Sequence, residues 1–215
     1  MRVKSIKPNK AVPGVYIVEL EDSDSVIYID TDTLIKLGLK KGVEVENEKV
    51  NELLATSPSK LLFVKLKNRL LLKKYSEKQI IRYITTNKIY RENKNLINID
   101  EIINNLLNLG LLDDEKFANR IIEKRSSQKA VSNNAIKREL QIAGVDKILI
   151  QELTKDFTDE DDIRKIDEVA EKFIRTKRLS LSDRKDVEKL KRHLLYKGYT
   201  FDVINSLIDR LSISL

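Results

Sequence analysis

The hydrophobic and polar positions of this chain follow two different spacings, one in the first 60 residues and another in the rest. Apolar side chains at 16, 18 and 20 occur at every second position, and a second apolar run covers 26–29. The polar residues 21–25 between these runs are typical of a turn. We therefore expect a β-hairpin in the first 60 residues.

Shorter elements are expected between the hairpin and residue 60. A short helix begins with Asp32 as its N-terminal cap and stops at Gly38. A short strand at 43–45 and a helix at 46–55 follow. Pro58 then predicts a boundary near residue 59, because a proline disfavours helix in the residue before it.

From residue 61 onward, apolar residues recur at the three- and four-residue spacing of amphipathic helices. Ser76 and Gln79 fit a capping box, and Asp100 and Asp113 are suited to begin two further helices. Several glycines follow the apolar runs and predict where helices end. The apolar positions that define nine expected helices lie within 62–70, 80–84, 102–107, 117–122, 136–140, 150–157, 163–174, 187–194 and 203–211.

An internal repeat relates successive parts of this helical region. At an offset of 54 residues, Leu140 aligns with Leu194 and Gly144 aligns with Gly198. Each block consists of a longer helix, a second helix that ends at glycine, and a third helix. The first block follows the same plan, with Ile84 in the place of Leu140. Helical units of this size are stable when they stack and bury each other's open faces.

We therefore predict a mainly α-helical protein. Three tandem three-helix repeats form an elongated, curved rod, preceded by a small N-terminal unit of β-hairpin and helix. A rod with a groove suits a long, periodic partner better than a small molecule. A repeat kept only for stability is the alternative, because a fold alone does not set a function. The expected division is 1–59 for the N-terminal unit and 60–112, 113–158 and 159–215 for the three repeats.

The net charge of +7, from 41 Lys and Arg against 34 Asp and Glu, is concentrated in one segment. Residues 61–112 carry ten basic and four acidic side chains, whereas residues 1–60 carry nine and ten. The segments 113–157 and 158–215 are both close to balance. A uniform solvated surface would not concentrate charge in this way, and a basic segment suits a polyanionic partner.

The sequence offers no arrangement of residues for catalysis, so we expect a non-enzymatic protein without a cofactor or metal ion. Its one histidine, His193, excludes histidine-based dyads and multi-histidine metal sites. The six glycines form no phosphate-binding loop motif. The acidic run at 159–162 precedes a helix, where negative charge favours capping over cation binding.

Cysteine is absent, and no apolar run approaches the ~20 residues that span a bilayer. No apolar stretch follows the basic residues at 2, 4 and 7, so no signal peptide is visible. We accordingly expect no membrane partner, and a monomer in the reducing cytoplasm.

Clusters of lysine and arginine are the candidate functional residues, because they neutralise phosphates and make binding depend on salt. For any one of them, a plain solvated surface is the alternative. Tyr75, Tyr83 and Tyr90 accompany the first cluster and suit stacking on exposed bases, with half-buried packing as the alternative. The candidates are Lys65, Lys67, Arg69, Lys73, Lys74, Arg120, Lys124, Arg125, Lys137, Arg138, Arg175, Lys177, Arg178, Lys191 and Arg192.

Two other classes of function stay open at this level. A stand-alone helical nucleic-acid-binding protein would carry a recognition helix with several base-reading side chains, and no helix here stands out in that way. A purely structural adaptor would bind a protein without nucleic acid.

Four short motifs resemble segments of the RecX family of regulatory proteins, in the family's order and spacing. Residues 34–42 (LIKLGLKKG) resemble its LxKLGLKKG segment, and residues 76–84 (SEKQIIRYI) resemble the start of its first repeat. Residues 109–118 (LGLLDDEKFA) are similar to its most typical signature, and residues 136–145 (IKRELQIAGV) to its IrrELrqkGI segment. The chain departs from the family where Lys88 replaces a glycine and where 129–134 lacks the glycine of a basic stretch.

The resemblance implies a regulator that binds the groove of the RecA recombinase filament. Such a protein modulates, and mostly inhibits, the recombinase, ATPase and coprotease activities of RecA, and so damps recombination, DNA repair and the SOS response. The resemblance also implies that ATP hydrolysis belongs to RecA. The basic residues named above would then contact RecA carboxylates or the phosphates of single- or double-stranded DNA.

Overall fold

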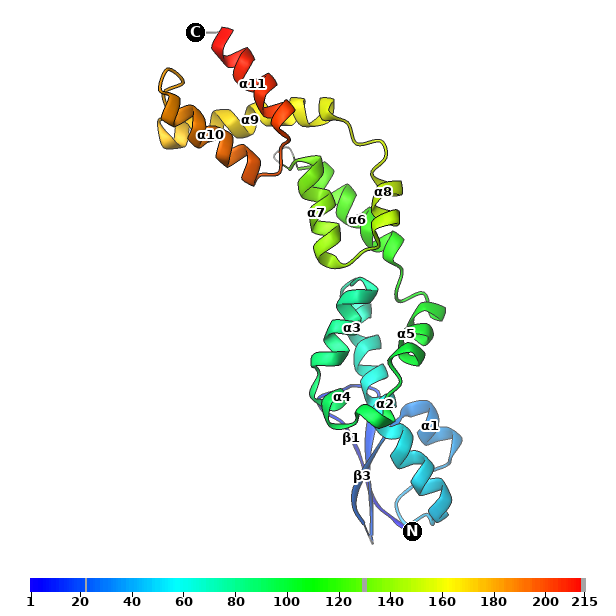
Figure 1. Cartoon of the computed structure of the whole chain (residues 1–215). Coiled ribbons are helices and arrows are strands. Elements are labelled where there is room, and N and C mark those ends of the chain that lie inside the picture. The colour runs from blue at the N-terminus through cyan, green and yellow to red at the C-terminus, as the bar shows by residue number, and fades with distance from the viewer. Residues whose placement is uncertain (22, 129–130, 214–215) are drawn as a thin grey trace. The chain divides into compact units, whose positions relative to one another are not determined.

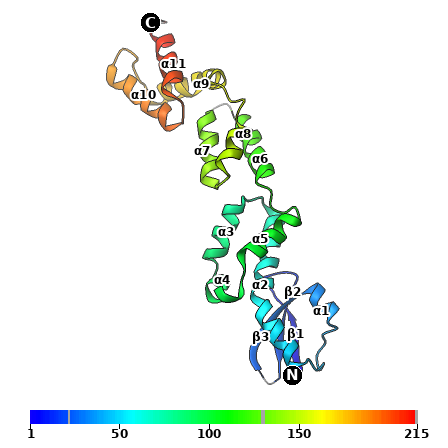
Figure 2. The ribbon, with the colours of Figure 1, turned by 45° about the vertical axis from the view of Figure 1, so that its right-hand side comes forward.

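The structure, a computed structural model, describes residues 1–21, 23–128 and 131–213. They form two compact units, Met1–Asp113 and Asp114–Leu215. Asp22 of the expected turn, and Lys129 and Ala130 of the stretch that departs from the RecX pattern, lie outside the described residues. The chain is mainly helical, with a small sheet in its N-terminal part (Figures 1 and 2). The predicted fold class, mainly α with a small N-terminal β unit, is confirmed.

The sheet has three antiparallel strands in the order β1-β2-β3. Strands β2 (Val15–Leu20) and β3 (Ser23–Asp30) form the expected hairpin, with Val18 paired to Ile27. Strand β1 (Val3–Pro8) pairs with β2 and was not expected from the sequence. The strand expected at 43–45 is wrong, because this segment contributes only an isolated bridge between Glu44 and Arg2.

Two helices begin two residues earlier than the capping carboxylates predicted. Helix α1 (Thr31–Lys36) is capped by Asp30, whose side chain accepts a hydrogen bond of 2.6 Å from the Thr33 N–H, and not by Asp32. Helix α5 (Ile99–Asn108) is capped by Asn98, and not by Asp100. In each case the capping residue has extended backbone and the expected aspartate lies in the first turn. A carboxylate there still stabilises the helix dipole.

Helix α2 (Asn47–Leu72) is continuous across residue 59, so the break expected at Pro58 is wrong. Its first half packs Val50 and Leu53 against the sheet. Its second half packs Leu62, Leu66 and Leu70 into the next core. Proline has no N–H to donate to the preceding turn, but burial of both halves of the helix offsets that loss.

The second core of this unit is built from α2 and the helices after it. They are α3 (Glu77–Thr86), α4 (Lys88–Glu92), the 3-10 turn η1 (Lys94–Leu96) and α5. The predicted capping box at Ser76 and Gln79 is confirmed, with both hydrogen bonds at 3.2 Å. Ile80 and Ile84 of α3 are fully buried against the leucines of α2. The first helical repeat therefore shares one long helix with the β unit.

The second unit contains two three-helix repeats: α6 (Asp114–Ser126), α7 (Asn133–Ala143) and α8 (Lys147–Leu153), then α9 (Asp159–Lys177), α10 (Arg184–Tyr196) and α11 (Phe201–Ile213). The 54-residue offset is confirmed by equivalent geometry. Leu140 and Leu194 are both fully buried, and Gly144 and Gly198 have φ angles of +86° and +91°. A left-handed residue at these two positions is the reason for glycine after each helix.

Buried polar groups join the two repeats of this unit. The Ser132 hydroxyl caps α7 and also donates a hydrogen bond of 2.9 Å to the Lys197 carbonyl at the end of α10. Asp162 of α9, 1% exposed, accepts a hydrogen bond of 2.9 Å from the Asn133 backbone N–H. Burial raises the pKa of the Asp162 carboxyl, although that hydrogen bond lowers it. These contacts fix the start of α7 against α9 and α10, because an unmade buried hydrogen bond is costly.

Candidate functional site

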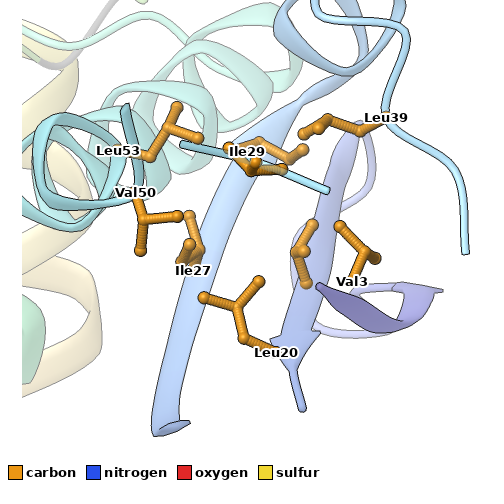
Figure 3. A pocket seen from close by; sticks show the side chains of 9 residues that line it. Val3, Leu20, Ile27, Ile29, Leu39, Val50 and Leu53 are labelled. Carbon is orange, nitrogen blue, oxygen red and sulfur yellow. The ribbon is translucent and has the colours of Figure 1, made fainter. Parts of the chain in front are cut away.

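The hollow beneath the sheet is a gap in the core and not a ligand site. Figure 3 shows Val3, Leu20, Ile27 and Ile29 of the strands facing Val50 and neighbouring residues. Every residue that lines this hollow is apolar, and its volume of about 10 Å³ is close to that of one water probe. It has no polar group that could orient a ligand or carry chemistry.

The described residues contain no group of three or more acidic, histidine or cysteine side chains that could hold a metal ion. His193 is stacked on Phe173, with ring centroids 3.8 Å apart and an interplanar angle of 7°. Residues of the acidic run at 159–162 make hydrogen bonds that stabilise the fold. Asp161 forms a capping box with Thr158, as the sequence suggested for this cluster, and Asp162 joins the two repeats. Within the described part of the chain, no helix has both the length and the apolar character to cross a membrane.

The fifteen basic candidates fall into three groups, each described within its own unit. One group lies in the second half of α2 and directly after it, one lies on α6 and α7, and one lies at the end of α9 and on α10. Most of these side chains are exposed, and Lys65, Arg125, Lys137 and Lys191 are half-buried. The first group is Lys65, Lys67, Arg69, Lys73 and Lys74; the second is Arg120, Lys124, Arg125, Lys137 and Arg138; the third is Arg175, Lys177, Arg178, Lys191 and Arg192.

Two candidates of the second group have partners inside the protein. Arg125 binds both carboxylate oxygens of Glu139, at 2.7 and 3.0 Å, and donates to Gln128 at 3.1 Å. Lys137 lies 5.9 Å from the centre of the Phe157 ring. A two-point arginine–carboxylate pair holds its guanidinium in place, so Arg125 serves to join α6 to α7.

The first group contains an organised surface, formed where α2 ends and α3 begins. The Arg69 guanidinium lies over the rings of Tyr75 and Tyr83, 4.8 and 4.6 Å from their centres. Lys73 lies 5.3 Å from the centre of the Tyr75 ring. Arg69, Tyr75, Tyr83 and Arg82 line one shallow hollow. We call these four residues, together with Lys73, the Arg69 surface.

The Arg69 surface combines fixed positive charge with exposed apolar side chains. Contact with two rings restricts the guanidinium while its N–H groups remain available, and a guanidinium matches carboxylates and phosphates in two-point geometry. Leu71 and Leu72, at the end of α2, are 63% and 90% exposed. Exposed apolar side chains next to cations are suited to bind a protein surface that carries carboxylates. This region is therefore the best candidate for a protein contact.

The sequence pointed to four members of this surface, without indicating that they meet: Arg69, Lys73, Tyr75 and Tyr83. Arg69 and the two tyrosines belong to different helices or to the segment between them, so their contact depends on the angle between α2 and α3. All three expected tyrosines are half-buried and pack against the first-repeat core. Arg82 and the two leucines were not among the candidates. The one local feature that could have identified Arg82 as a candidate is its position on the exposed side of α3, three residues after Gln79.

Replacing Arg69 by alanine is expected to lower the free energy of unfolding of the first unit by about 1 kcal/mol. Two cation–ring contacts at an exposed site disappear, and each contributes about 0.5–1 kcal/mol. Chemical denaturation measures this change. Arg91→Ala is the matched control, because Arg91 is an exposed arginine of the same unit without a ring contact among the described residues. Equal effects of the two substitutions would show that the stacked geometry contributes nothing.

Comparison with known sequences identifies relatives along nearly the whole chain. Residues 159–208 match the family model described as "RecX, third three-helix domain". Regulatory protein RecX of Bacillus licheniformis is 26% identical over 97% of this chain and 75% of its own length. The protein of the same name from Lactococcus lactis is 26% identical over 99% of this chain and 77% of its own length.

Two solved structures have a similar fold. The chain in "Crystal structure of regulatory protein RecX" superposes with a TM-score of 0.66 and 18% identity, over 97% of this chain and 98% of that one. RecX from Lactobacillus salivarius superposes with a TM-score of 0.57 and 24% identity, over 73% of this chain and 97% of that one. The matched residues 159–208 cover α9, α10 and the first part of α11, the helices of the third three-helix repeat.

Proposed function

Because this chain belongs to the RecX family of regulatory proteins, we propose that it binds the RecA filament in the cytoplasm and mostly inhibits it. The observation that carries the proposal is the extent of the similarity. It covers 97% of the chain in the Bacillus licheniformis relative and includes all three helical repeats, so a function of the whole relative is a reasonable expectation. The proposed outcome is reduced ATPase, strand exchange and coprotease activity of RecA.

The Arg69 surface supports a protein contact as part of this function. It places two arginines and a lysine beside exposed leucines, a combination that suits a carboxylate-bearing protein surface. Repeated helical units suit a filament, because a filament repeats the same surface from one protomer to the next. We propose that the Arg69 surface of the first unit contacts RecA protein and that the second unit makes further contacts with the filament.

The ATPase of RecA on single-stranded DNA tests the proposal. Adding the chain at less than one copy per RecA protomer is expected to lower the rate of hydrolysis. Arg69→Glu should require several-fold more protein for the same effect, because it places a like charge opposite carboxylates. Arg91→Glu, an equal charge change elsewhere in the unit, should behave as the unchanged chain. If all three proteins leave the ATPase unaffected at equimolar dose, the proposed function is wrong.

The stand-alone nucleic-acid-binding reading makes a different prediction. A protein of that kind would bind DNA equally well with and without RecA, and would affect RecA only by competing for DNA. Raising the DNA concentration would then restore the ATPase, whereas inhibition through RecA itself would persist.

A further inference from the structure

A second basic surface, distinct from the Arg69 surface, lies in the third repeat between α9 and α10. These helices contact each other, and a shallow hollow opens where α9 ends. Phe173 and Lys177 line it from α9, and Arg192, His193 and Tyr196 line it from α10. We call these five residues the Tyr196 groove.

The floor of the Tyr196 groove is aromatic. Phe173 and His193 are stacked in parallel, with centroids 3.8 Å apart. Burial, and to a smaller extent the charge of Lys197, lowers the pKa of His193, which favours the uncharged imidazole. Tyr196 follows His193 by three residues, on the same side of the helix, and is 82% exposed. An aromatic ring this exposed, beside a stacked pair, offers a free face to a flat ligand.

The rim of the groove is positively charged. Lys177 and Arg192 are exposed, and neither has a carboxylate within 4.0 Å among the ion pairs of the described residues. Lys189 also lines the hollow, but it is paired with Asp186 at 2.8 Å. Two cations beside an aromatic face match the two parts of an unpaired nucleotide, its phosphate and its base.

The position of the second repeat that is equivalent to Tyr196 carries an aliphatic side chain in place of the aromatic ring. Tyr196 aligns with Ile142 at the 54-residue offset, and Ile142 is 81% exposed. Both positions therefore present a large apolar side chain to solvent, but only the third repeat presents a ring. An exposed ring beside two cations can stack on an unpaired base, which the aliphatic side chain at the same position of the second repeat cannot do.

We propose that the Tyr196 groove binds single-stranded DNA, with an unpaired base stacked on Tyr196 and the neighbouring phosphates held by Lys177 and Arg192. This inference goes beyond the regulation of RecA, because it requires no recombinase. It also goes beyond phosphate neutralisation by scattered basic residues, because it assigns a base-stacking position and two phosphate-binding side chains.

The test is binding of the full-length chain, without RecA, to a fluorescein-labelled oligothymidylate of about 12 nucleotides, followed by fluorescence anisotropy. Tyr196→Leu keeps an apolar side chain at an exposed position and removes the ring. It should weaken binding at least about fivefold, because base–aromatic stacking carries that much affinity. Tyr196→Phe keeps the ring and should bind as the unchanged chain. Ile142→Ala is the control in the second repeat and should have no effect.

Two further measurements examine the charges and the need for unpaired bases. Lys177→Gln and Arg192→Gln should each reduce the slope of log affinity against log salt by about 0.7. A duplex of the same length should compete less well than the single strand, because its bases are stacked on each other.

Equal binding by Tyr196→Leu and the unchanged chain, or equal competition by the duplex, would overturn the proposal. Loss of RecA inhibition in Tyr196→Leu with unchanged oligonucleotide binding would also overturn it, and would make the groove a protein contact. Because Arg69→Glu tests RecA regulation on the other unit, failure of either proposal is distinguishable from failure of the other.

Discussion

Leu66→Ala is expected to lower the free energy of unfolding of the first unit by about 2–5 kcal/mol. Leu66 lies in the middle of the second half of α2 and is fully buried. Truncation removes the apolar contacts of its side chain and leaves a cavity among Leu62, Leu70, Ile80 and Ile84, which relax only partly. Truncations of fully buried leucines are among the most destabilising single substitutions in folded proteins.

The same substitution should also weaken the sheet, because α2 contributes side chains to both cores. Val50 and Leu53 of α2 pack on the strands, and the Ser57 hydroxyl accepts a hydrogen bond of 2.6 Å from the Tyr28 N–H of β3. Amide hydrogen exchange should therefore accelerate at Ile27 together with the helical core.

Leu72→Ala is the control for this experiment, because Leu72 ends the same helix and is 90% exposed. Its cost should stay within about 0.5 kcal/mol. If Leu66→Ala accelerates exchange in the helices and leaves the strands unchanged, the sheet and the first repeat are independent. The predicted division at residue 59 would then describe the folding units better than a shared helix does.

Gly198→Ala is expected to destabilise the second unit by about 3 kcal/mol. Gly198 has a φ of +91°, where an L-residue is strained by about 1–2 kcal/mol. An added Cβ would also lie 2.7 Å from the Ser132 hydroxyl and 3.1 Å from the Ala135 backbone nitrogen. Overpacking of this kind costs a further 1–3 kcal/mol, since the backbone of α7 cannot move without losing its cap.

Gly110→Ala separates the two causes. Gly110 also has a positive φ, of +63°, but nothing lies within 4 Å of an added Cβ. Its cost should be about 1 kcal/mol, from backbone strain alone. Thermal or chemical denaturation of both variants gives the comparison. If the two costs are equal, the crowding of the added Cβ at Gly198 against the start of α7 carries no energetic penalty.

The local features of the fold could be predicted because each depends on neighbours in the sequence. Helical spacing, the Ser76 capping box and the glycines at the 54-residue offset are each determined by residues that are close in sequence, and the structure confirms them. Continuity across Pro58 could not be predicted in this way. It depends on two cores that hold the two halves of α2, which a local rule about proline does not include.

The functional surfaces were predictable only as residue types. Arg69, Lys73, Lys177 and Arg192 were candidates because of their charge. The contacts of Arg69 with the tyrosine rings, and the rings beside Lys177 and Arg192, became visible only in three dimensions. Asp162 shows the opposite case. The sequence places it in an acidic run that begins a helix, whereas its burial against α7 comes from packing between repeats. Contacts between elements distant in sequence carry no short-range signal.

The length of RecA filaments on single-stranded DNA tests the central claim most directly. Electron microscopy can measure the length distribution as the chain is added, from well below one copy per RecA protomer up to equimolar amounts. The proposed function predicts filaments that shorten already at the substoichiometric doses. A distribution that stays unchanged up to equimolar chain would contradict it.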